Sequence, residues 1–236
     1  MRGRILQPNL MFDLIYRQDN YLSVGLNMDF KFFVDRVNKV LYVFFQHSRG
    51  ALDWFHNILT TPSRKRVQDG QGWFVHAGFS RVWRSGNDHV LGQLEHWLER
   101  PQFRDFIVVF GGFSHGAPLA QLAAREWFER TGRRHLCICF GSPRLAWGIE
   151  ALRVIGDSQQ LINWVNPGDP VTHVPLTRWG FQHVRENIVN VRHIPVLSFL
   201  RPVHHHEIYT YANIYPENWE DLLIGVFGED YLRRIT

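Results

Sequence analysis

The sequence predicts an α/β fold, in which helices flank both faces of a mostly parallel central sheet. Two observations lead to this prediction. Short runs of continuously apolar residues recur along the chain, which is typical of strands buried on both faces. Segments with apolar residues at helical spacing separate these runs, and such alternation favours a helix-covered parallel sheet. Because the 236 residues contain no internal repeat or long linker, we expect one domain over residues 1–236.

The predicted sheet begins with a hairpin. Residues 28–35 alternate imperfectly between apolar and polar side chains, and residues 39–46 form a continuous run rich in β-branched and aromatic side chains. Asp35 and Asn38 bound the turn between them, since both residue types favour turns. Further strands are expected at residues 106–110, 135–140, 161–165 and 187–196.

Two helices are expected between these strands. Residues 79–100 carry apolar side chains at helical spacing, and Pro101 closes the segment. Residues 118–130 place their apolar side chains on one face, and Gly132 ends that helix.

Composition excludes several classes of protein. Lys and Arg exceed Asp and Glu by only four (26 against 22), and no run of like charges indicates a nucleic-acid partner. No stretch of 18 apolar residues predicts a transmembrane helix. The N-terminus lacks the apolar core and cleavage site of a signal peptide, so cytoplasmic synthesis is the default expectation. Cys137 and Cys139 would share one face of a strand, which suits a disulfide poorly, and we expect reduced core residues.

The segment Gly112-Phe113-Ser114-His115-Gly116 has the spacing G-x-S-x-G. A serine on a sharp strand-to-helix turn needs small residues two positions before and after it, because these approach each other closely. An apolar strand precedes the motif and an amphipathic helix follows it, which is the context of a nucleophilic serine. The alternative is a glycine-rich turn with an incidental serine.

An activated serine needs a base, and the base needs an orienting acid. Asp169 lies four residues beyond the strand expected at 161–165, where a carboxylate reaches the carboxyl edge of a parallel sheet. Its surroundings, Asn-Pro-Gly-Asp-Pro, are also ordinary turn sequence. Asp157 is the rival candidate, but it precedes a strand instead of following one.

The base cannot be chosen from the residues alone. The candidate histidines are His173, His183, His193, His204, His205 and His206. The last three are adjacent in sequence, and adjacent residues rarely converge on one ion, so a metal site is not expected.

Six segments together are similar to the class 3 lipase family, a fungal-lipase-like branch of the α/β-hydrolases. They occur in the family's order and span residues 40–209. The segments are VLYVFFQHSRGALDWFHNI, FVHAGFSRVW, IVVFGGFSHGAPLAQLAA, CFGSPRL, NWVNPGDPVTHVPL and HHHEIY. The resemblance implies an α/β-hydrolase fold and an enzyme that hydrolyses carboxylic esters of lipids.

The same resemblance implies a role for each site residue. Ser114 corresponds to the nucleophile, Asp169 to the orienting acid and His206 to the general base. His206 is preferred to His204 and His205 because it fits the family's H-x-x-Y pattern with Tyr209. The backbone N–H groups of Ser48 and His115 correspond to the oxyanion hole; for Ser48 the alternative is a polar residue that merely ends a strand.

The resemblance also implies a lid over the acyl group, at residues 49–73. The reaction that it implies needs no metal or organic cofactor. The apolar side chains that would cover the acyl group are those of Trp54, Phe55, Ile58 and Leu59. Basic residues Arg64, Lys65 and Arg66 in the same segment suit an anionic lipid surface. The alternative is that these aromatic residues belong to the core.

The chain departs from the family at several positions near the serine. Phe113 replaces the usual His before the nucleophile, and His115 replaces the usual Leu after it. His47 stands where the first motif has Gly, and Ala117 replaces a second Gly after the elbow. These changes keep two alternatives open: a soluble esterase, thioesterase or amidase on the same fold, and a non-catalytic binding or assembly protein that retains the scaffold.

Overall fold

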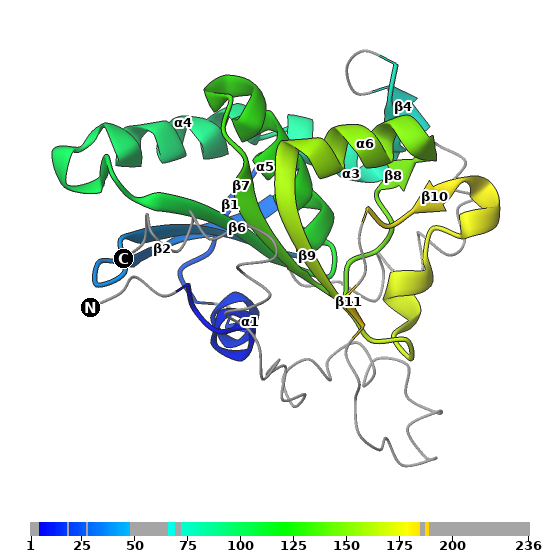
Figure 1. Ribbon diagram of the computed structural model, residues 1–236, viewed down its shortest axis with the longest axis horizontal. Helices are drawn as coiled ribbons and strands as arrows, with labels where there is room; N and C mark the ends of the chain where they lie inside the picture. Colours follow the sequence, from blue (N-terminus) through cyan, green and yellow to red (C-terminus); the bar gives the residue numbers. More distant parts are fainter. Residues whose placement is uncertain are drawn as a thin grey trace.

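The computed structural model describes residues 5–17, 19–26, 28–47, 66–68, 72–184 and 187–188. Within these residues, seven strands form the central sheet in the order β1-β2-β3-β6-β7-β9-β11 (Figure 1). Their bounds are β1 Leu22–Val24, β2 Met28–Asp35, β3 Val40–His47, β6 Ile107–Phe113, β7 His135–Phe140, β9 Gln159–Val165 and β11 Asn187–Ile188.

Strands β3, β6, β7, β9 and β11 run parallel to one another, and β1 and β2 are antiparallel additions at the β3 edge. The predicted mostly parallel sheet is therefore confirmed. The predicted hairpin turn is also present: the Asn38 N–H donates to Asp35 Oδ1 at 3.0 Å, and the Asn38 amide donates to Asp35 Oδ2 at 2.6 Å.

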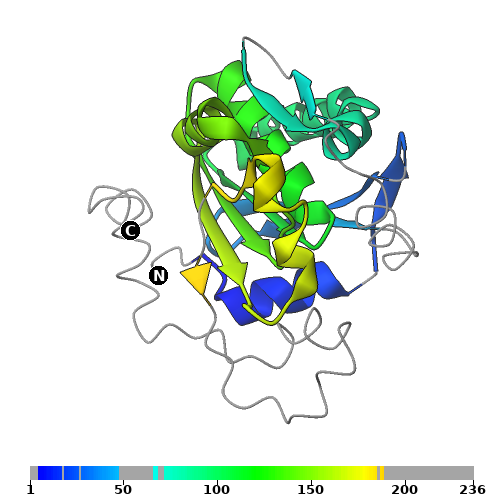
Figure 2. The ribbon, with the colours of Figure 1, turned by 90° about the vertical axis from the view of Figure 1, so that its right-hand side faces the viewer.

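Helices cover both faces of this sheet. The five α-helices in the described part of the chain are α1 Pro8–Tyr16, α3 Ala77–Arg84, α4 Asn87–Glu99, α5 Gly116–Thr131 and α6 Gly148–Ser158. Helix α1 lies on one side of the sheet and α4, α5 and α6 lie on the other (Figures 1 and 2). The predicted layer arrangement is confirmed.

Two apolar clusters fill the space between the helices and the sheet. In β3, Leu41, Val43 and Phe45 belong to the cluster that includes residues of α3 to α6. The alternate residues of that strand, such as Tyr42 and Phe44, belong to the cluster that includes α1. This alternation is why a continuously apolar strand is stable here, since both of its faces are buried.

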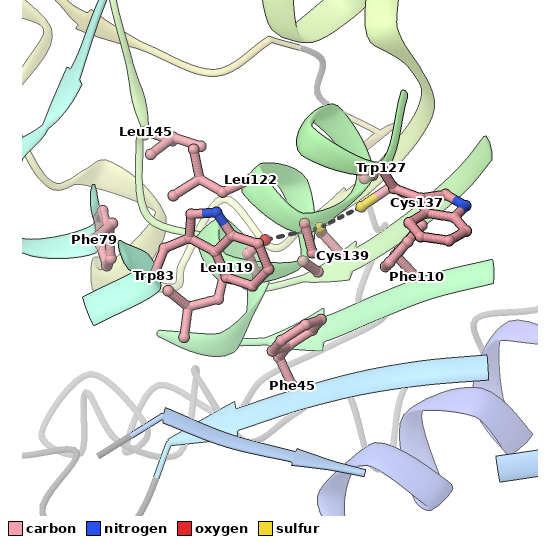
Figure 3. Packing of buried hydrophobic residues seen from close by; sticks show 14 of the residues in the cluster. Phe45, Phe79, Trp83, Phe110, Leu119, Leu122, Trp127, Cys137, Cys139 and Leu145 are labelled. Carbon is pink, nitrogen blue, oxygen red and sulfur yellow. Dashed lines mark hydrogen bonds between the residues drawn. The ribbon is translucent and has the colours of Figure 1, made fainter. Parts of the chain in front are cut away.

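Cys137 and Cys139 point to the same face of β7, as predicted, and their Sγ atoms lie 3.8 Å apart without a disulfide (Figure 3). Both are buried in the first cluster, and Cys139 Sγ is 3.5 Å from the Ala117 carbonyl oxygen in α5. Burial, with the hydrogen bond to Cys139, raises the pKa of the Cys137 thiol well above its ordinary value. The prediction of reduced core cysteines is confirmed.

A smaller antiparallel sheet lies beside α3 and α6, in the order β10-β8-β5-β4. Its strands are β4 Arg66–Gln68, β5 Phe74–His76, β8 Ala146–Trp147 and β10 Phe181–Gln182. Short 3-10 helices occupy Pro101–Phe103, Pro170–His173 and Thr177–Trp179. The second of these follows β9 and carries part of the candidate site.

Two predicted boundaries are wrong. The single helix expected at residues 79–100 is two helices, α3 and α4, because the chain turns at Ser85 and Gly86. The Ser85 hydroxyl accepts the Leu26 N–H at 2.8 Å, and a Cβ on Gly86 would lie 2.7 Å from Met28 Cε. The strand expected at 106–110 continues through the glycines to Phe113, since β3 and β7 pair with it there.

Candidate active site

Ser114 connects the end of β6 to the start of α5. Its φ is +54°, a left-handed conformation that residues other than glycine rarely adopt. Such a conformation persists only where the surroundings enforce it, and it is common at functional sites. The predicted strand-to-helix turn is therefore present at Ser114, with the strained backbone that a nucleophile elbow requires.

The two glycines of the motif are required by close backbone contacts. A Cβ on Gly112 would collide with the backbone carbonyl of Gly116, so the two ends of the turn touch. A Cβ on Gly116 would collide with the Phe45 carbonyl of β3. The first contact closes the turn, and the second allows the N-terminus of α5 to lie against the carboxyl end of β3.

Backbone hydrogen bonds hold Ser114 from both sides. Its N–H donates to the Phe140 carbonyl of β7 at 3.0 Å, and its carbonyl accepts the Ala117 N–H at 3.1 Å. The serine is 7% exposed. The positive end of the α5 dipole is directed at this turn and would stabilise an anion there.

His115 directly precedes α5. It is 2% exposed, and its ring centroid lies 5.4 Å from that of Phe79 in α3. The His76 ring also contacts Phe79, with centroids 4.9 Å apart, and lies 5.6 Å from the Phe181 ring. Burial lowers the pKa of His76 to about 4, so this imidazole is neutral at pH 7. The His115 imidazole, which replaces the family's Leu, is thus buried against the Phe79 ring.

Asp169 follows β9 and begins the 3-10 helix Pro170–His173. It is fully buried, and its Oδ1 accepts the Val171 N–H at 2.9 Å. The Asp169 N–H donates to the Asn166 carbonyl at 2.9 Å, and the Thr172 hydroxyl donates to the Asp169 carbonyl at 2.8 Å. The backbone and one carboxylate oxygen of Asp169 are therefore fixed by local hydrogen bonds.

Ser114 and Asp169 lie at the same edge of the sheet. Phe113 pairs with Phe140, and Phe140 pairs with Trp164, so the carboxyl ends of β6, β7 and β9 are level. Ser114 directly follows Phe113, and Asp169 lies four residues beyond the end of β9. The rival Asp157 instead lies in the last turn of α6, before β9 begins, and thus at the opposite, amino edge of the sheet.

Arg144 holds the chain that follows Asp169, a role that sequence reasoning missed. Its guanidinium donates to the carbonyls of His173 and, at 3.1 Å, Pro175, while its N–H donates to the Val174 carbonyl at 2.8 Å. The arginine lies in the Gly-Ser-Pro-Arg segment after β7. That segment was the signal available in the sequence, although it does not reveal which carbonyls the arginine binds.

Two of the candidate histidines lie in the described part of the chain. The His173 ring Nε2 is 2.8 Å from the Pro167 carbonyl. The His183 ring lies between the Thr172 carbonyl, at 2.8 Å from Nε2, and the Asn163 amide, at 3.3 Å from Nδ1. Both rings therefore have partners in the loop that carries Asp169.

The other predicted site residues lie outside the described residues. These are Ser48, His193, His204, His205, His206 and the predicted lid residues Trp54, Phe55, Ile58, Leu59, Arg64 and Lys65. Of the strand expected at 187–196, only Asn187 and Ile188 are described, as β11. The roles of these residues stay predictions.

Neither a metal site nor a membrane span is found in the described ranges. No group of three or more His, Cys, Asp or Glu side chains in those ranges is arranged to hold a metal ion. No helix in them is both long and apolar enough to cross a membrane.

Solved structures of fungal lipases have a similar fold. A mutant form of MDLA from Penicillium cyclopium is 21% identical, with a TM-score of 0.64 over 73% of this chain and 63% of that one. The triacylglyceride lipase of Rhizomucor miehei is 20% identical, with a TM-score of 0.63 over 73% and 66%. The mono- and diacylglycerol lipase of Aspergillus oryzae is 24% identical, with a TM-score of 0.61 over 73% and 63%. The matched region is thus less than two thirds of each of these lipases.

The sequence itself matches a family model. A comparison with curated protein sequences gave no match. The model of the class 3 lipases matches residues 42–179, which is more than half of the 236 residues and includes both Ser114 and Asp169. The matched segment contains the strained serine, the two glycines that its turn requires and the buried acid beyond β9. On this evidence the chain belongs to the class 3 lipase family.

Proposed function

We propose that the chain hydrolyses carboxylic esters of lipids through a covalent acyl-enzyme intermediate on Ser114. The observation that carries this proposal is the left-handed backbone of Ser114, at the junction of a buried strand and the N-terminus of a helix. A strained serine in this setting is typical of a nucleophile presented at the edge of an α/β sheet. Family membership supports the same reaction class.

The proposed reaction has two steps. In the first, the Ser114 hydroxyl attacks the ester carbonyl while His206 takes the hydroxyl proton and passes it to the departing alcohol. In the second, His206 takes a proton from water, the resulting hydroxide attacks the acyl-Ser114 ester, and the proton returns to the serine. Asp169 orients the imidazole and stabilises its cationic form.

Backbone donors would stabilise the oxyanion in both steps. The His115 N–H belongs to the first turn at the positive end of α5, where negative charge is favoured. The Ser48 N–H is the second proposed donor, with a contribution from its hydroxyl. Preorganised donors of this kind are typically worth roughly 3 kcal/mol each in the transition state.

The substrate proposal rests on the family and on the composition of residues 49–73. Trp54, Phe55, Ile58 and Leu59 would cover the acyl chain, and Arg64, Lys65 and Arg66 would contact an anionic lipid surface. Two of the similar solved structures are named as a triacylglyceride lipase and a mono- and diacylglycerol lipase, so glycerol esters are the first substrates to test. The chemistry requires no metal or organic cofactor.

An ester series tests this function. Initial rates are measured on p-nitrophenyl esters of short and long acyl chains and on an emulsified triacylglycerol, for the wild type, Ser114→Ala and Asp169→Asn. Ser158→Ala is the matched control, because Ser158 is also buried but lies at the end of α6.

We expect Ser114→Ala and Asp169→Asn each to lower the rate at least roughly 10³-fold, and the control to leave it unchanged. A rate that rises when the substrate forms an interface supports a lipase. Activity confined to soluble short esters would instead support a soluble esterase. Equal rates in the wild type and Ser114→Ala would contradict the proposed mechanism.

A further inference from the structure

Phe113 lies directly before the proposed nucleophile, Ser114. Its side chain is 6% exposed and belongs to the apolar cluster on the sheet face that α1 covers. There it meets two rings of α1: that of Phe12, with centroids 5.1 Å apart in an edge-to-face arrangement, and that of Tyr16, 6.0 Å away. The residue that replaces the family's His therefore packs on the N-terminal helix.

The Phe12 ring also contacts β7, the strand that pairs with β6. Its ring centroid is 5.1 Å from that of Phe140 in β7, again edge to face. The Phe140 carbonyl accepts the Ser114 N–H. One buried ring in α1 thus touches both the residue that precedes Ser114 and the residue that fixes the Ser114 amide.

Two contacts with the sheet fix the position of α1. The Leu6 N–H donates to the Tyr42 hydroxyl of β3 at 2.8 Å, which ties the segment before α1 to the sheet. Ile15 packs so closely on β6 that a Cβ on Gly111 would lie 3.3 Å from Ile15 Cδ1. Residues 8–16 lie before the segment that matches the family model, which begins at residue 42.

We propose that Phe12 is a positioning residue for the nucleophile: by packing on Phe113 and Phe140 together, it keeps the Ser114 backbone left-handed. A strained conformation relaxes when the contacts around it are removed, so the hydroxyl would lose its alignment without this ring. This inference rests on the proposed function, in which Ser114 is the nucleophile. It assigns to α1 a part in catalysis without contact with the substrate.

The test compares Phe12→Leu and Phe12→Ala with Met11→Ala. Met11 is the neighbouring residue in α1, is equally buried and belongs to the same apolar cluster, so its truncation gives a matched loss of packing. Two quantities are measured well below the melting temperature of each variant: the hydrogen-exchange rate of the Ser114 amide, and the second-order rate constant for labelling by a fluorophosphonate. Melting temperatures are recorded alongside.

We expect Phe12→Leu to raise the exchange rate of the Ser114 amide about tenfold and to lower the labelling rate constant by about the same factor. Met11→Ala should change both by less than about twofold, even where it lowers the melting temperature more. Equal effects of the two substitutions on exchange, or an unchanged labelling rate in Phe12→Leu, would overturn the inference. Failure of the wild type to react contradicts the proposed function instead, while the exchange comparison still decides whether Phe12 holds Ser114.

Discussion

At the scale of the residue, two glycines, Gly112 and Gly116, explain the shape of the candidate active site. Hydrogen atoms in place of Cβ at Gly112 and Gly116 allow backbone to approach backbone, and this approach holds Ser114 at φ +54°. Gly116 has a further effect, because it brings the start of α5 against β3. The α5 N-terminus, with the His115 N–H, can then face the same point as the serine.

Gly116→Ala tests this explanation. The added methyl group would collide with the Phe45 carbonyl, which belongs to a central strand and cannot move aside cheaply. We expect a loss of about 1–3 kcal/mol in the free energy of unfolding, measured by urea denaturation.

The control is Gly92→Ala in α4, where a Cβ would meet nothing within 4 Å. There we expect a gain of up to about 1 kcal/mol, because alanine favours helix more than glycine does. A Gly116→Ala protein as stable as the wild type would contradict the close contact with β3.

Local sequence predicts much of this residue-scale geometry and none of its distant contacts. The G-x-S-x-G spacing predicts the turn because the steric demand acts within five residues. The packing of His115 on Phe79, and of Phe113 on Phe12, joins residues that are far apart in the chain. No periodicity encodes such pairs, so only the folded chain reveals them.

At the scale of the element, the loop after β9 is held by an arginine from the loop after β7. Arg144 donates hydrogen bonds to carbonyls of His173 and Pro175, beyond the 3-10 helix that Asp169 begins. Carbonyls at the end of a loop are better fixed by a planar guanidinium than by a flexible ammonium. The loop that begins at Asp169 is thereby tied to the loop that follows β7.

Arg144→Met should therefore weaken both stability and activity. Loss of charge-assisted hydrogen bonds is expected to lower the free energy of unfolding by about 2 kcal/mol and kcat/KM by about tenfold. Arg153→Met is the control, since Arg153 is exposed and pairs with the exposed Glu150 of the same helix, and such a pair is worth little. If both variants hydrolyse ester at the wild-type rate, Arg144 does not position the acid.

Element boundaries were predicted less well than elements. Apolar spacing predicts helix through residues 79–100, yet Ser85 and Gly86 end α3 because β1 and β2 pack against them. The glycines after residue 110 suggest a loop, but hydrogen bonding to both neighbouring strands extends β6 to Phe113. In each case a contact distant in sequence overrides the local preference.

At the scale of the whole molecule, the sheet divides the core into two clusters, and each supports the site. The cluster with α3 to α6 lies beside His115, and the cluster with α1 lies beside Phe113. The continuously apolar runs in the sequence predict a sheet that is covered on both faces. The N-terminal helix was not predicted, because its short segment carries too few periodic residues to be distinguished from a loop.

Buried histidines make the stability of the whole fold depend on pH. Burial lowers the pKa of His76 from 6.5 to about 4, and chiefly burial lowers that of His135 to about 4. Between these values the unfolded chain binds protons that the folded chain does not, so the free energy of unfolding falls as the pH falls from about 6.5 to 4. Each histidine contributes at most about 1.4 kcal/mol per pH unit in this window.

We therefore expect His76→Leu to reduce the difference in unfolding free energy between pH 7 and pH 4.5 by about 2 kcal/mol, measured by urea denaturation at each pH. The same substitution at His89, which is exposed, should leave that difference unchanged. A pH dependence equal to that of the wild type in His76→Leu would show that this imidazole is not buried in its neutral form.

The most direct test of the central claim, that Ser114 is an activated nucleophile, is the mass of the protein after reaction with a fluorophosphonate. The account predicts one adduct per wild-type chain, located by peptide mapping at Ser114, and none in Ser114→Ala. The matched variant Ser158→Ala should carry the same adduct as the wild type. A wild-type chain that gains no mass, or an adduct that persists in Ser114→Ala, would contradict the claim.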